Sequence, residues 1–543
     1  MCRNTSPKAH VYSSSPMQRL IHVAAILRRP AAGAVCTGLL LALAFPCHPE
    51  NPVAFLYTGL WAWIALAPLL AGLRGSLSLP SAFRLGATTG FLFHLLSLYW
   101  IGNTQGGGLA VVAGAILGAA WLSLFTGAFA VAHVLVLRRF GPQALLAAPV
   151  LWTSMEYLQS LGELGFPWLL LAHSQASFPV LLQQATVTGA YGVSFAILLC
   201  CALIARAMIC GLHRWRWLGA AVAVPATAIL YGTLTMESET PGGLRVAVVQ
   251  NNMGIEKWRA GGLDKSLTSL AALSRQAVTS ATAPDLLLWP ETAVPCNLGR
   301  RPDCRRRMRD LVEELDIPIL TGAPDTDVET QEPYNSSFLF RPRQPEVLSY
   351  AKMHLVPFGE RTPWRDSIPL LRNIDWSALT GDLGPAEFAR GTRRTLFPVA
   401  TEQDTAQFAV LICFESVFPD LVRRSVDAGA DFLVIITNDS WFGATAGPFQ
   451  HAAIASLRAV ENRTAIARCA TNGISLFIDR FGRQRLHTEL GTADVRQDDV
   501  ARRQGSTFYT RHGDLFAGAC LILSLLLLLV AGVRPPVTPV DHG

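Results

Sequence analysis

The stretch "LICFESVFPD", residues 411–420, ends an apolar run at Cys413 and continues into a helix-like segment. Loops that follow strands carry much of the chemistry of α/β domains, so a cysteine at this point is a candidate nucleophile. The chain has eleven cysteines, however, and free cysteine is among the residue types most often buried. The surroundings of Cys413 therefore have to decide between a nucleophile and a packing residue.

Eight short runs within residues 240–510 have the apolar and β-branched content of strands. They are 244–252, 283–291, 317–325, 335–342, 406–415, 430–439, 464–472 and 474–482. Helical candidates lie near 262–280, 303–315, 417–428 and 448–462. Strands and helices in alternation predict an α/β domain whose sheets are covered by helices.

Three segments of the 240–510 region carry reactive side chains. "LLLWPET" presents Glu291, "YAKMHLVPFGE" presents Lys352, and "VLICFES" presents Cys413. A cysteine needs a base to become a thiolate, and a nearby lysine can stabilise an oxyanion. Each residue also has an ordinary structural explanation: a carboxylate at a helix start, a solvated surface cation and a core thiol, respectively.

The rest of the chain is strongly apolar, with 51% hydrophobic and only 15% charged residues. A helix needs about 20 mostly apolar residues to cross a bilayer. Eight such runs predict membrane spans at about 31–47, 53–73, 85–102, 107–136, 142–161, 178–205, 217–235 and 514–533. The predicted domains are a tail (1–30), seven spans (31–239), a catalytic domain (240–510), and a last span with a short tail (511–543).

Arginine placement predicts the orientation, because cytoplasmic loops collect Lys and Arg. Arginines occur in every second connection: Arg19, Arg28 and Arg29; Arg74 and Arg84; Arg138 and Arg139; Arg206, Arg214 and Arg216. The intervening connections "PCHPENP", "GNTQGGG" and "QSLGELGFPWLLLAHSQASFP" carry no Lys or Arg. The N-terminus is therefore expected in the cytoplasm, the 240–510 domain outside it, and Arg534 in the cytoplasm again.

A signal peptide is the competing interpretation of residues 17–47. However, "LALAFPC" is a poor cleavage site and further spans follow, so the sequence favours a retained membrane anchor. The polar residues 1–16 are interpreted as a tail or as sequence before a true start at Met17. The net charge of +6 suits anionic lipid headgroups and gives no indication of nucleic-acid binding.

Local context strengthens the nucleophile hypothesis. "WPE", "YxKxHLVPFGE" and "CFExxFP", followed by "TNDSWFG" (437–443), resemble the nitrilase superfamily. With seven spans ahead, one behind, and "GFPWLLLAHSQ" (165–175), the chain resembles the apolipoprotein N-acyltransferases, the membrane-fused family. The resemblance implies a multi-span α-helical membrane domain joined to an extracytoplasmic α/β domain with the nitrilase-like α-β-β-α sandwich.

The resemblance also implies roles for individual residues. Cys413 would be the nucleophile, Glu291 the general base and acid, and Lys352 the group that stabilises the tetrahedral intermediate. Four further residues match the family's supporting carboxylates and site aromatics: Glu360, Glu415, Trp258 and Trp441. Phe414 departs from the pattern, since many members carry tyrosine after the cysteine.

The implied reaction moves an acyl chain from a phospholipid to Cys413 and then to the α-amino group of a diacylglyceryl-cysteine. Its partners would be phospholipid, apolipoproteins and the membrane, in the bacterial inner membrane with a periplasmic active site. No metal-ligand cluster, Walker loop or dinucleotide fingerprint stands in the sequence, so neither cofactor nor metal is expected. A membrane-anchored amidase that uses water as second nucleophile is the alternative; transport is disfavoured.

Four other ionisable residues stand in contexts that bear on function. His451 lies near a helix start, which favours capping or packing, and His354 is interpreted as structural. Glu156 and Glu163 lie in or beside the fifth span, where a carboxylate is a functional candidate, and both are left unassigned.

Cys296 and Cys304, in "VPCNLGRRPDCRRR", are predicted to form a disulfide. The topology places them in the periplasm, where exposed thiols on a polar loop commonly pair. The residues between them allow the approach that a disulfide requires. Two unpaired surface cysteines are the alternative.

Overall fold

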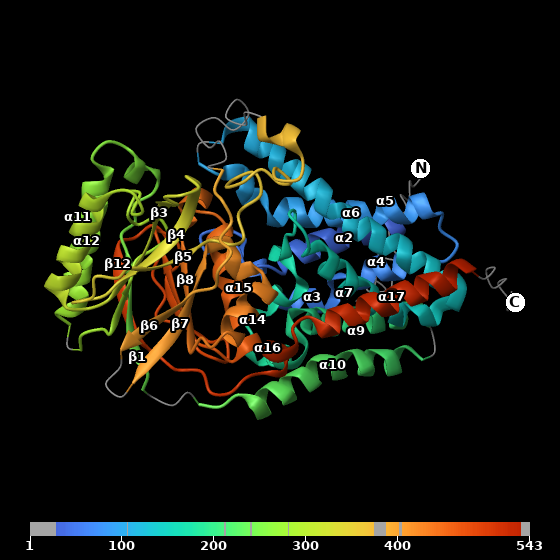
Figure 1. Cartoon of the computed structure of the whole chain (residues 1–543). Helices are drawn as coiled ribbons and strands as arrows, with labels where there is room; N and C mark the ends of the chain where they lie inside the picture. Colours follow the sequence, from blue (N-terminus) through green and yellow to red (C-terminus); the bar gives the residue numbers. More distant parts are fainter. Residues whose placement is uncertain are drawn as a thin grey trace, which may run out of the picture.

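The computed structural model describes residues 29–105, 107–210, 213–238, 242–280, 282–373, 387–400 and 404–533. The chain folds into a helical half and a two-sheet half that lie side by side (Figure 1). The expectations for residues 1–16, Met17, Arg19, Arg28 and Arg534 lie outside the described residues.

The helical half contains ten α-helices of the described chain. They are α2 (Pro30–Leu43), α3 (Ala62–Ala65), α4 (Ala67–Gly72), α5 (Leu79–Ser97), α6 (Gly108–Phe140), α7 (Ala148–Gln159), α8 (Pro179–Leu182), α9 (Ala185–Ile209), α10 (Arg214–Thr235) and α17 (Leu515–Val533). Helix α17 packs against α7, so the last span returns to the helices that precede the two-sheet half.

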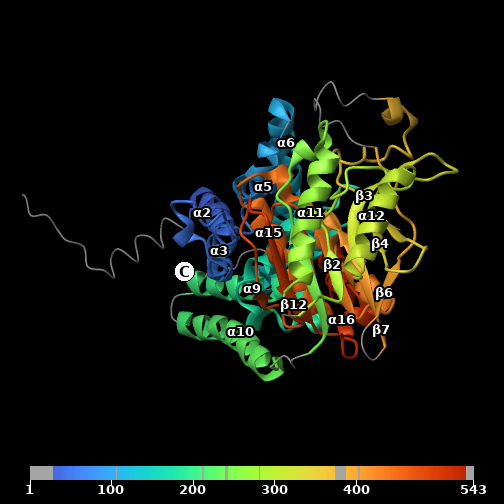
Figure 2. The same cartoon turned by 90° about the vertical axis from the view of Figure 1, so that its left-hand side faces the viewer.

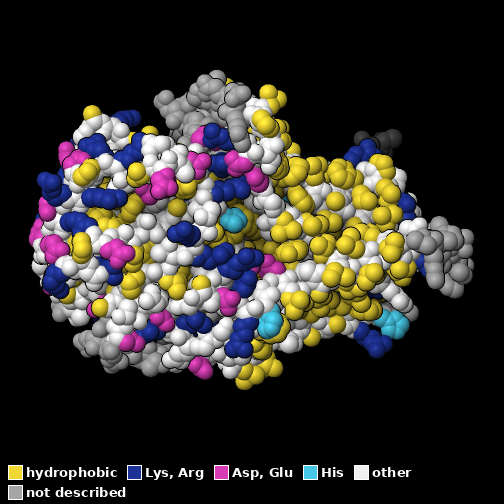
Figure 3. All heavy atoms as spheres, in the orientation of Figure 1, with side chains coloured by type: hydrophobic (Ala, Val, Ile, Leu, Met, Phe, Trp, Pro, Cys, Tyr) yellow, Lys and Arg dark blue, Asp and Glu magenta, His cyan; other side chains and the backbone are white. Residues whose placement is uncertain are grey.

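Five helical stretches of the described chain are long and apolar enough to cross a membrane: Ala54–Gly72, Gly108–Gln159, Ala185–Ile209, Arg214–Thr235 and Leu515–Gly532. The second of them contains two predicted spans, because α6 and α7 meet at a turn after Phe140. The other two predicted spans coincide with α2, an apolar helix of 14 residues, and α5. Hydrophobic side chains gather over these helices (Figure 3), and the number of crossings stays a prediction.

The two-sheet half contains twelve strands of the described residues. They are β1 (Leu244–Gln250), β2 (Leu286–Leu288), β3 (Ile319–Thr326), β4 (Pro333–Phe340), β5 (Leu348–Ala351), β6 (Leu396–Ala400), β7 (Thr405–Ile412), β8 (Phe432–Thr437), β9 (Ile466–Ala470), β10 (Leu476–Ile478), β11 (Gln484–Arg485) and β12 (Asp494–Val500). One sheet has the order β12-β1-β2-β3-β4-β5 and the other β11-β10-β9-β8-β7-β6.

The two sheets pack face to face between helices, with α11 (Gly262–Val278) and α12 (Pro302–Leu315) on one side (Figure 2). Alternate strand residues such as Val248 and Val434 meet in the core between the sheets. Helices α14 (Pro419–Asp427) and α15 (Gly447–Asn462) cover the second sheet, and Ala455 of α15 and Leu433 of β8 belong to the same buried cluster. This arrangement confirms the predicted α-β-β-α sandwich.

Helix α15 joins the two halves. It is almost entirely buried, because Ala455 and Ala459 face the second sheet while Ile454, Leu457 and Val460 belong to the core of the membrane helices. A short helix, α16 (Phe508–His512), then leads into α17. The two-sheet half is therefore fixed to the helical half through packed side chains and not through linkers alone.

Candidate active site

Cys413 lies directly after the inner strand β7, at the start of a single helical turn, Cys413–Val417. Its φ of 53° is in the left-handed region, which is uncommon and strained for a residue with a side chain. The main-chain N–H of Ile412 donates to Glu415 Oε2 at 2.8 Å, which fixes the turn against the strand end. The predicted strand at 406–415 therefore ends before the cysteine.

Glu291 follows β2 and is buried. Its Oε1 accepts a hydrogen bond from Asn335 Nδ2 at 2.7 Å, and its Oε2 accepts one from the main-chain N–H of Asn438 at 2.8 Å. Gly322 of β3 allows the approach, since a Cβ there would lie 2.7 Å from the Glu291 Cα. Both carboxylate oxygens are thus held in place by donors from the ends of other strands.

Lys352 follows β5 and is 1% exposed. Its Nζ lies 3.3 Å from Glu291 Oε1 and 2.9 Å from Glu360 Oε1. Burial by itself would lower the pKa of this ammonium group, but the charges of Glu291 and Glu360 outweigh burial and raise the pKa above its ordinary value. Lys352 therefore stays a cation throughout the physiological pH range.

The electrostatics of the Cys413 thiol are dominated by burial, which raises its pKa above the ordinary value. The charge of Glu291 raises the pKa further, while Lys352 opposes the shift. At neutral pH the resting thiol is therefore protonated, and its use as a nucleophile requires a base that takes the proton. The structure thus brings together a thiol, a carboxylate and an ammonium group, the three groups that the sequence singled out.

The two predicted supporting carboxylates lie in the same network. Glu360 accepts from Asn335 Nδ2 at 3.0 Å and from the main-chain N–H of Val356 at 2.8 Å. Glu415 is buried, which raises its pKa against the opposing effect of the hydrogen bond from Ile412. Both carboxylates organise backbone around the candidate catalytic groups.

The two predicted aromatic residues lie in helical turns after strands. Trp258 ends the turn Ile255–Trp258, with 48% of its surface exposed. Trp441 lies in the turn Asp439–Phe442, and its main-chain oxygen accepts a hydrogen bond from Gln105 of the helical half at 3.2 Å. A substrate-binding role for these tryptophans stays a prediction.

The helical half supplies aromatic side chains next to the Cys413 turn. The ring centroid of Phe414 lies 6.0 Å from that of Phe166 and 6.4 Å from that of Trp168. Phe166 and Trp168 belong to "GFPWLLLAHSQ", the stretch of the helical half that carried the family resemblance. Phe414, the departure from the family pattern, thus packs against the rings of the membrane domain.

Sequence reasoning missed three residues that contact Glu291: Asn335, Asn438 and Lys257. The polar Asn335 at the start of a predicted apolar strand was the available signal. Lys257 is 1% exposed, its Nζ lies 3.5 Å from the main-chain oxygen of Glu291, and burial lowers its pKa to about 8 against the charge of Glu291. Asn438 acts through its main chain, which no sequence pattern reveals.

The residues left unassigned from the sequence have definite partners. Glu156 Oε1 accepts from Trp152 Nε1 and from the main-chain N–H of Leu171, both at 2.9 Å. Glu163 Oε2 accepts from the main-chain N–H of Trp364 at 2.5 Å and pairs with Arg390 at 3.2 Å. Glu163 thus links the helical half to the segment that follows the Lys352 loop.

His354 contacts aromatic and backbone groups. Its ring centroid lies 4.4 Å from that of Phe418, and its main-chain N–H donates to Glu415 Oε1 at 3.2 Å. These contacts agree with the structural interpretation of this histidine.

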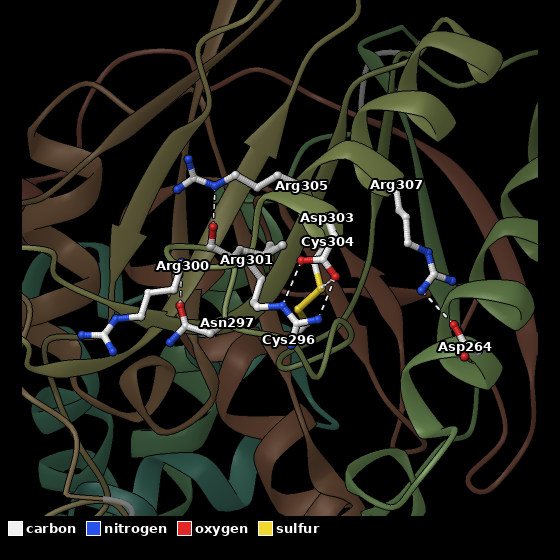
Figure 4. Close-up of a disulfide and its surroundings, with 10 residues drawn as sticks. Asp264, Cys296, Asn297, Arg300, Arg301, Asp303, Cys304, Arg305 and Arg307 are labelled. Carbon is white, nitrogen blue, oxygen red and sulfur yellow. Dashed lines mark hydrogen bonds and ion pairs between the residues drawn. A yellow bond between two sulfur atoms is a disulfide. The ribbon is translucent and has the colours of Figure 1, made fainter.

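Cys296 and Cys304 form a disulfide with a Cα–Cα distance of 6.7 Å, which confirms the predicted pairing (Figure 4). The bridge joins the segment after Glu291 to the first turn of α12. The two residues are only 8% and 1% exposed, so they belong to the core under α12 and not to an open polar loop. The expectation of exposed thiols was wrong.

Comparison with known proteins agrees with this geometry. Residues 37–203 match the apolipoprotein N-acyltransferase N-terminal domain, and residues 245–519 match the carbon-nitrogen hydrolase domain. An apolipoprotein N-acyltransferase of Chlorobaculum tepidum is 34% identical, with 94% of this chain and 98% of that protein covered. One of Geobacter metallireducens is also 34% identical, covering 92% and 94%. The chain therefore belongs to the apolipoprotein N-acyltransferase family, with a nitrilase-like catalytic domain fused to membrane helices.

Proposed function

We propose that this protein transfers an acyl chain from a phospholipid to the α-amino group of the N-terminal diacylglyceryl-cysteine of apolipoproteins, through a thioester on Cys413. The observation that carries the proposal is the contact of Glu291 with Lys352 beside the Cys413 turn, in a chain of this family. The membrane helices that support the site suit two lipid substrates.

In the first half-reaction, Glu291 takes the proton of the Cys413 thiol as sulfur attacks the ester carbonyl of the phospholipid. A carbon–sulfur bond forms, and the carbonyl oxygen becomes an oxyanion. Two N–H groups of the Lys352 ammonium face Glu291 and Glu360, and the third can donate to this oxyanion. The carbon–oxygen bond then breaks, and Glu291 returns the proton to the departing lysophospholipid. The acyl group remains on Cys413 as a thioester.

In the second half-reaction, the α-amino group of the diacylglyceryl-cysteine attacks the thioester carbon. Glu291 accepts a proton from the amine and delivers it to the Cys413 sulfur as the carbon–sulfur bond breaks. The products are an amide on the lipoprotein and the free thiol. The same carboxylate thus serves as base and then as acid in each half-reaction.

The proposed orientation places the catalytic domain on the periplasmic side of the inner membrane. Helix α6 begins beside Trp441 of the catalytic domain and ends at Arg138 and Arg139. Near the start of helix α9, the N–H of Ala190 donates to Glu461 of α15, and the helix carries Arg206 in its last turn. Arginine-bearing helix ends that point away from the catalytic domain support a cytoplasmic location for those ends.

Intact mass of the purified full-length protein tests the proposal. Incubation with phosphatidylethanolamine in detergent micelles should add one acyl chain to Cys413, and hydroxylamine should remove it because thioesters are cleaved by this nucleophile. Addition of a diacylglyceryl-cysteine peptide should release the enzyme and give N-acylated peptide. Absence of a hydroxylamine-sensitive adduct contradicts the proposal, and free fatty acid in place of acylated peptide would favour the amidase alternative, which the family assignment disfavours.

A further inference from the structure

His451, at the start of α15, extends the polar network behind the nucleophile turn. Its Nε2 lies 3.2 Å from the main-chain oxygen of Cys413 and 3.0 Å from Ser416 Oγ. Its Nδ1 lies 3.1 Å from Asp439 Oδ1. The His451 and Asp439 side chains are fully buried, and the proposed mechanism uses neither of them.

The partners of the imidazole indicate which nitrogen carries the proton. The Cys413 carbonyl can only accept, whereas Arg468 Nη2, 3.1 Å from Nδ1, can only donate. Both contacts are hydrogen bonds when Nε2 is protonated and Nδ1 is not, whereas the contact of Nδ1 with Asp439 Oδ1 is a hydrogen bond only when Nδ1 is also protonated. The Asp439 carboxylate is satisfied by Arg468 at 2.8 Å and Thr437 Oγ1 at 2.9 Å. Burial, assisted by the charge of Arg468, lowers the pKa of His451, which agrees with a neutral ring.

The Cys413 backbone needs such support. A residue with a side chain at φ 53° is strained and keeps this conformation only where its surroundings impose it. Two donors reach the carbonyl of this strained residue: the Ser416 hydroxyl at 2.9 Å and His451 Nε2 at 3.2 Å. The carbonyl is the part of Cys413 that can be held without interfering with the thiol.

We propose that His451 is a positioning residue for the acyl transfer: its Nε2–H holds the Cys413 carbonyl and thereby keeps the thiol directed at Glu291 and Lys352. The inference rests on the proposed role of Cys413 as nucleophile. The helical half contributes, because the ring of Trp168 lies 5.2 Å from that of His451 and confines it. The packing of the membrane helices is thus linked to the alignment of the nucleophile.

Three variants of the full-length protein separate positioning from folding. His451→Leu fills the site without a donor, His451→Gln places an amide donor near the Nε2 position, and Ser456→Ala is a matched control. Ser456 lies on the same helix and is fully buried, but it bonds to Gln484. The readout is single-turnover thioester formation with saturating phosphatidylethanolamine, recorded as a rate and as a final stoichiometry.

A misplaced nucleophile lowers the rate, whereas a folding defect lowers the stoichiometry. We expect His451→Leu to slow thioester formation by about 10–100-fold at normal stoichiometry, with an unchanged half-saturating phospholipid concentration. His451→Gln should recover most of the rate, and Ser456→Ala should match the parent protein. Ser416→Ala removes the other bond to the same carbonyl and should also slow the step.

Several results would overturn the inference. One is a normal rate of thioester formation in His451→Leu, whether the stoichiometry is normal or reduced. Equal rates in the leucine and glutamine variants, or a normal rate in Ser416→Ala, would also overturn it. If the parent protein forms no adduct, the proposed function itself fails, so the two failures are distinguishable.

Discussion

The carboxylate of Glu415 joins the backbone segments that carry Cys413 and Lys352, although these segments belong to different sheets. Its Oε2 accepts from the N–H of Ile412, the residue before the cysteine, at 2.8 Å. Its Oε1 accepts from the N–H of Met353, the residue after the lysine, at 2.6 Å and from the Tyr350 hydroxyl at 2.7 Å. One buried side chain thus sets the distance between the thiol and the ammonium group.

We expect Glu415→Gln to slow thioester formation by about 10–100-fold. The amide nitrogen of glutamine cannot accept a hydrogen bond, so one of the N–H groups that Glu415 now binds loses its acceptor. Small displacements of the reacting groups that follow are costly to the rate. Single-turnover adduct formation on purified protein measures the effect. Glu314→Gln is the control, since Glu314 pairs with Arg275 on the exposed face of the outer helices. An unchanged rate in Glu415→Gln would show that the two strand ends hold their places without this carboxylate.

The pH dependence of Cys413 alkylation tests whether the resting thiol is protonated. Burial raises the thiol pKa, so the thiolate fraction should increase about tenfold for each unit of pH up to at least pH 9. Alkylation of Cys413 by iodoacetamide, followed by peptide mass mapping, should therefore rise without a plateau, whereas free cysteine levels off near its ordinary pKa of about 8.5. A plateau near neutral pH would indicate a preformed thiolate and remove the need for Glu291 in the first step.

Whether a strand could be predicted from the sequence depends on its position in the sheet. The eight strands predicted from apolar runs are the eight inner strands, whereas the four missed strands, β5, β6, β11 and β12, are the four sheet edges. The edge strand β12, "DVRQDDV", is largely polar, and the edge strand β11 has only two residues, so neither contains an apolar run that would predict a strand. The three catalytic candidates were recognisable because each follows a strand or apolar segment with a motif around it.

The supporting contacts were not predictable for a different reason. Asn335, Asn438 and His451 acquire their roles when segments far apart in sequence meet, and His451 was interpreted only as a capping or packing residue. Its contact with the Cys413 carbonyl spans 38 positions of sequence. A local pattern contains no information about such a pair.

Glu156 provides a test of a structural against a functional role in the membrane domain. Oε1 of Glu156 accepts both the indole N–H of Trp152 and the main-chain N–H of Leu171. The amide oxygen of Glu156→Gln can keep both hydrogen bonds, whereas Glu156→Ala leaves both donors unpaired. We expect the glutamine variant to retain activity and the alanine variant to lose on the order of 1–3 kcal/mol per unpaired group. Thermal unfolding in detergent and the acylation assay measure the two quantities. Loss of acylation in a normally stable Glu156→Gln protein would instead assign this carboxylate a role in the reaction.

The disulfide should contribute stability without taking part in the chemistry. Closing the short loop between Cys296 and Cys304 stabilises by about 2–3 kcal/mol in the chain-entropy estimate. The paired substitution Cys296→Ser and Cys304→Ser should therefore lower the free energy of unfolding, with thioester formation per folded molecule unchanged. Non-reducing peptide mapping of the parent protein provides the control. Two freely alkylatable thiols at these positions would contradict the bridge.

Gln450 connects α15 to the helical half, and its replacement tests whether that connection matters to the reaction. Its Oε1 accepts from Trp100 Nε1 at 3.1 Å and Trp168 Nε1 at 3.0 Å, and its Nε2 donates to the main-chain oxygen of Ser97 at 3.1 Å. Gln450→Leu leaves these buried groups unpaired, at a cost of about 1–3 kcal/mol each.

We expect Gln450→Leu to lower the unfolding temperature in detergent and to slow thioester formation, because the neighbouring His451 loses the support of its helix turn. Gln276→Leu, at an exposed position of α11, is the control and should change neither quantity. A normal rate of thioester formation in a clearly destabilised Gln450→Leu protein would show that the contact between the halves serves stability alone.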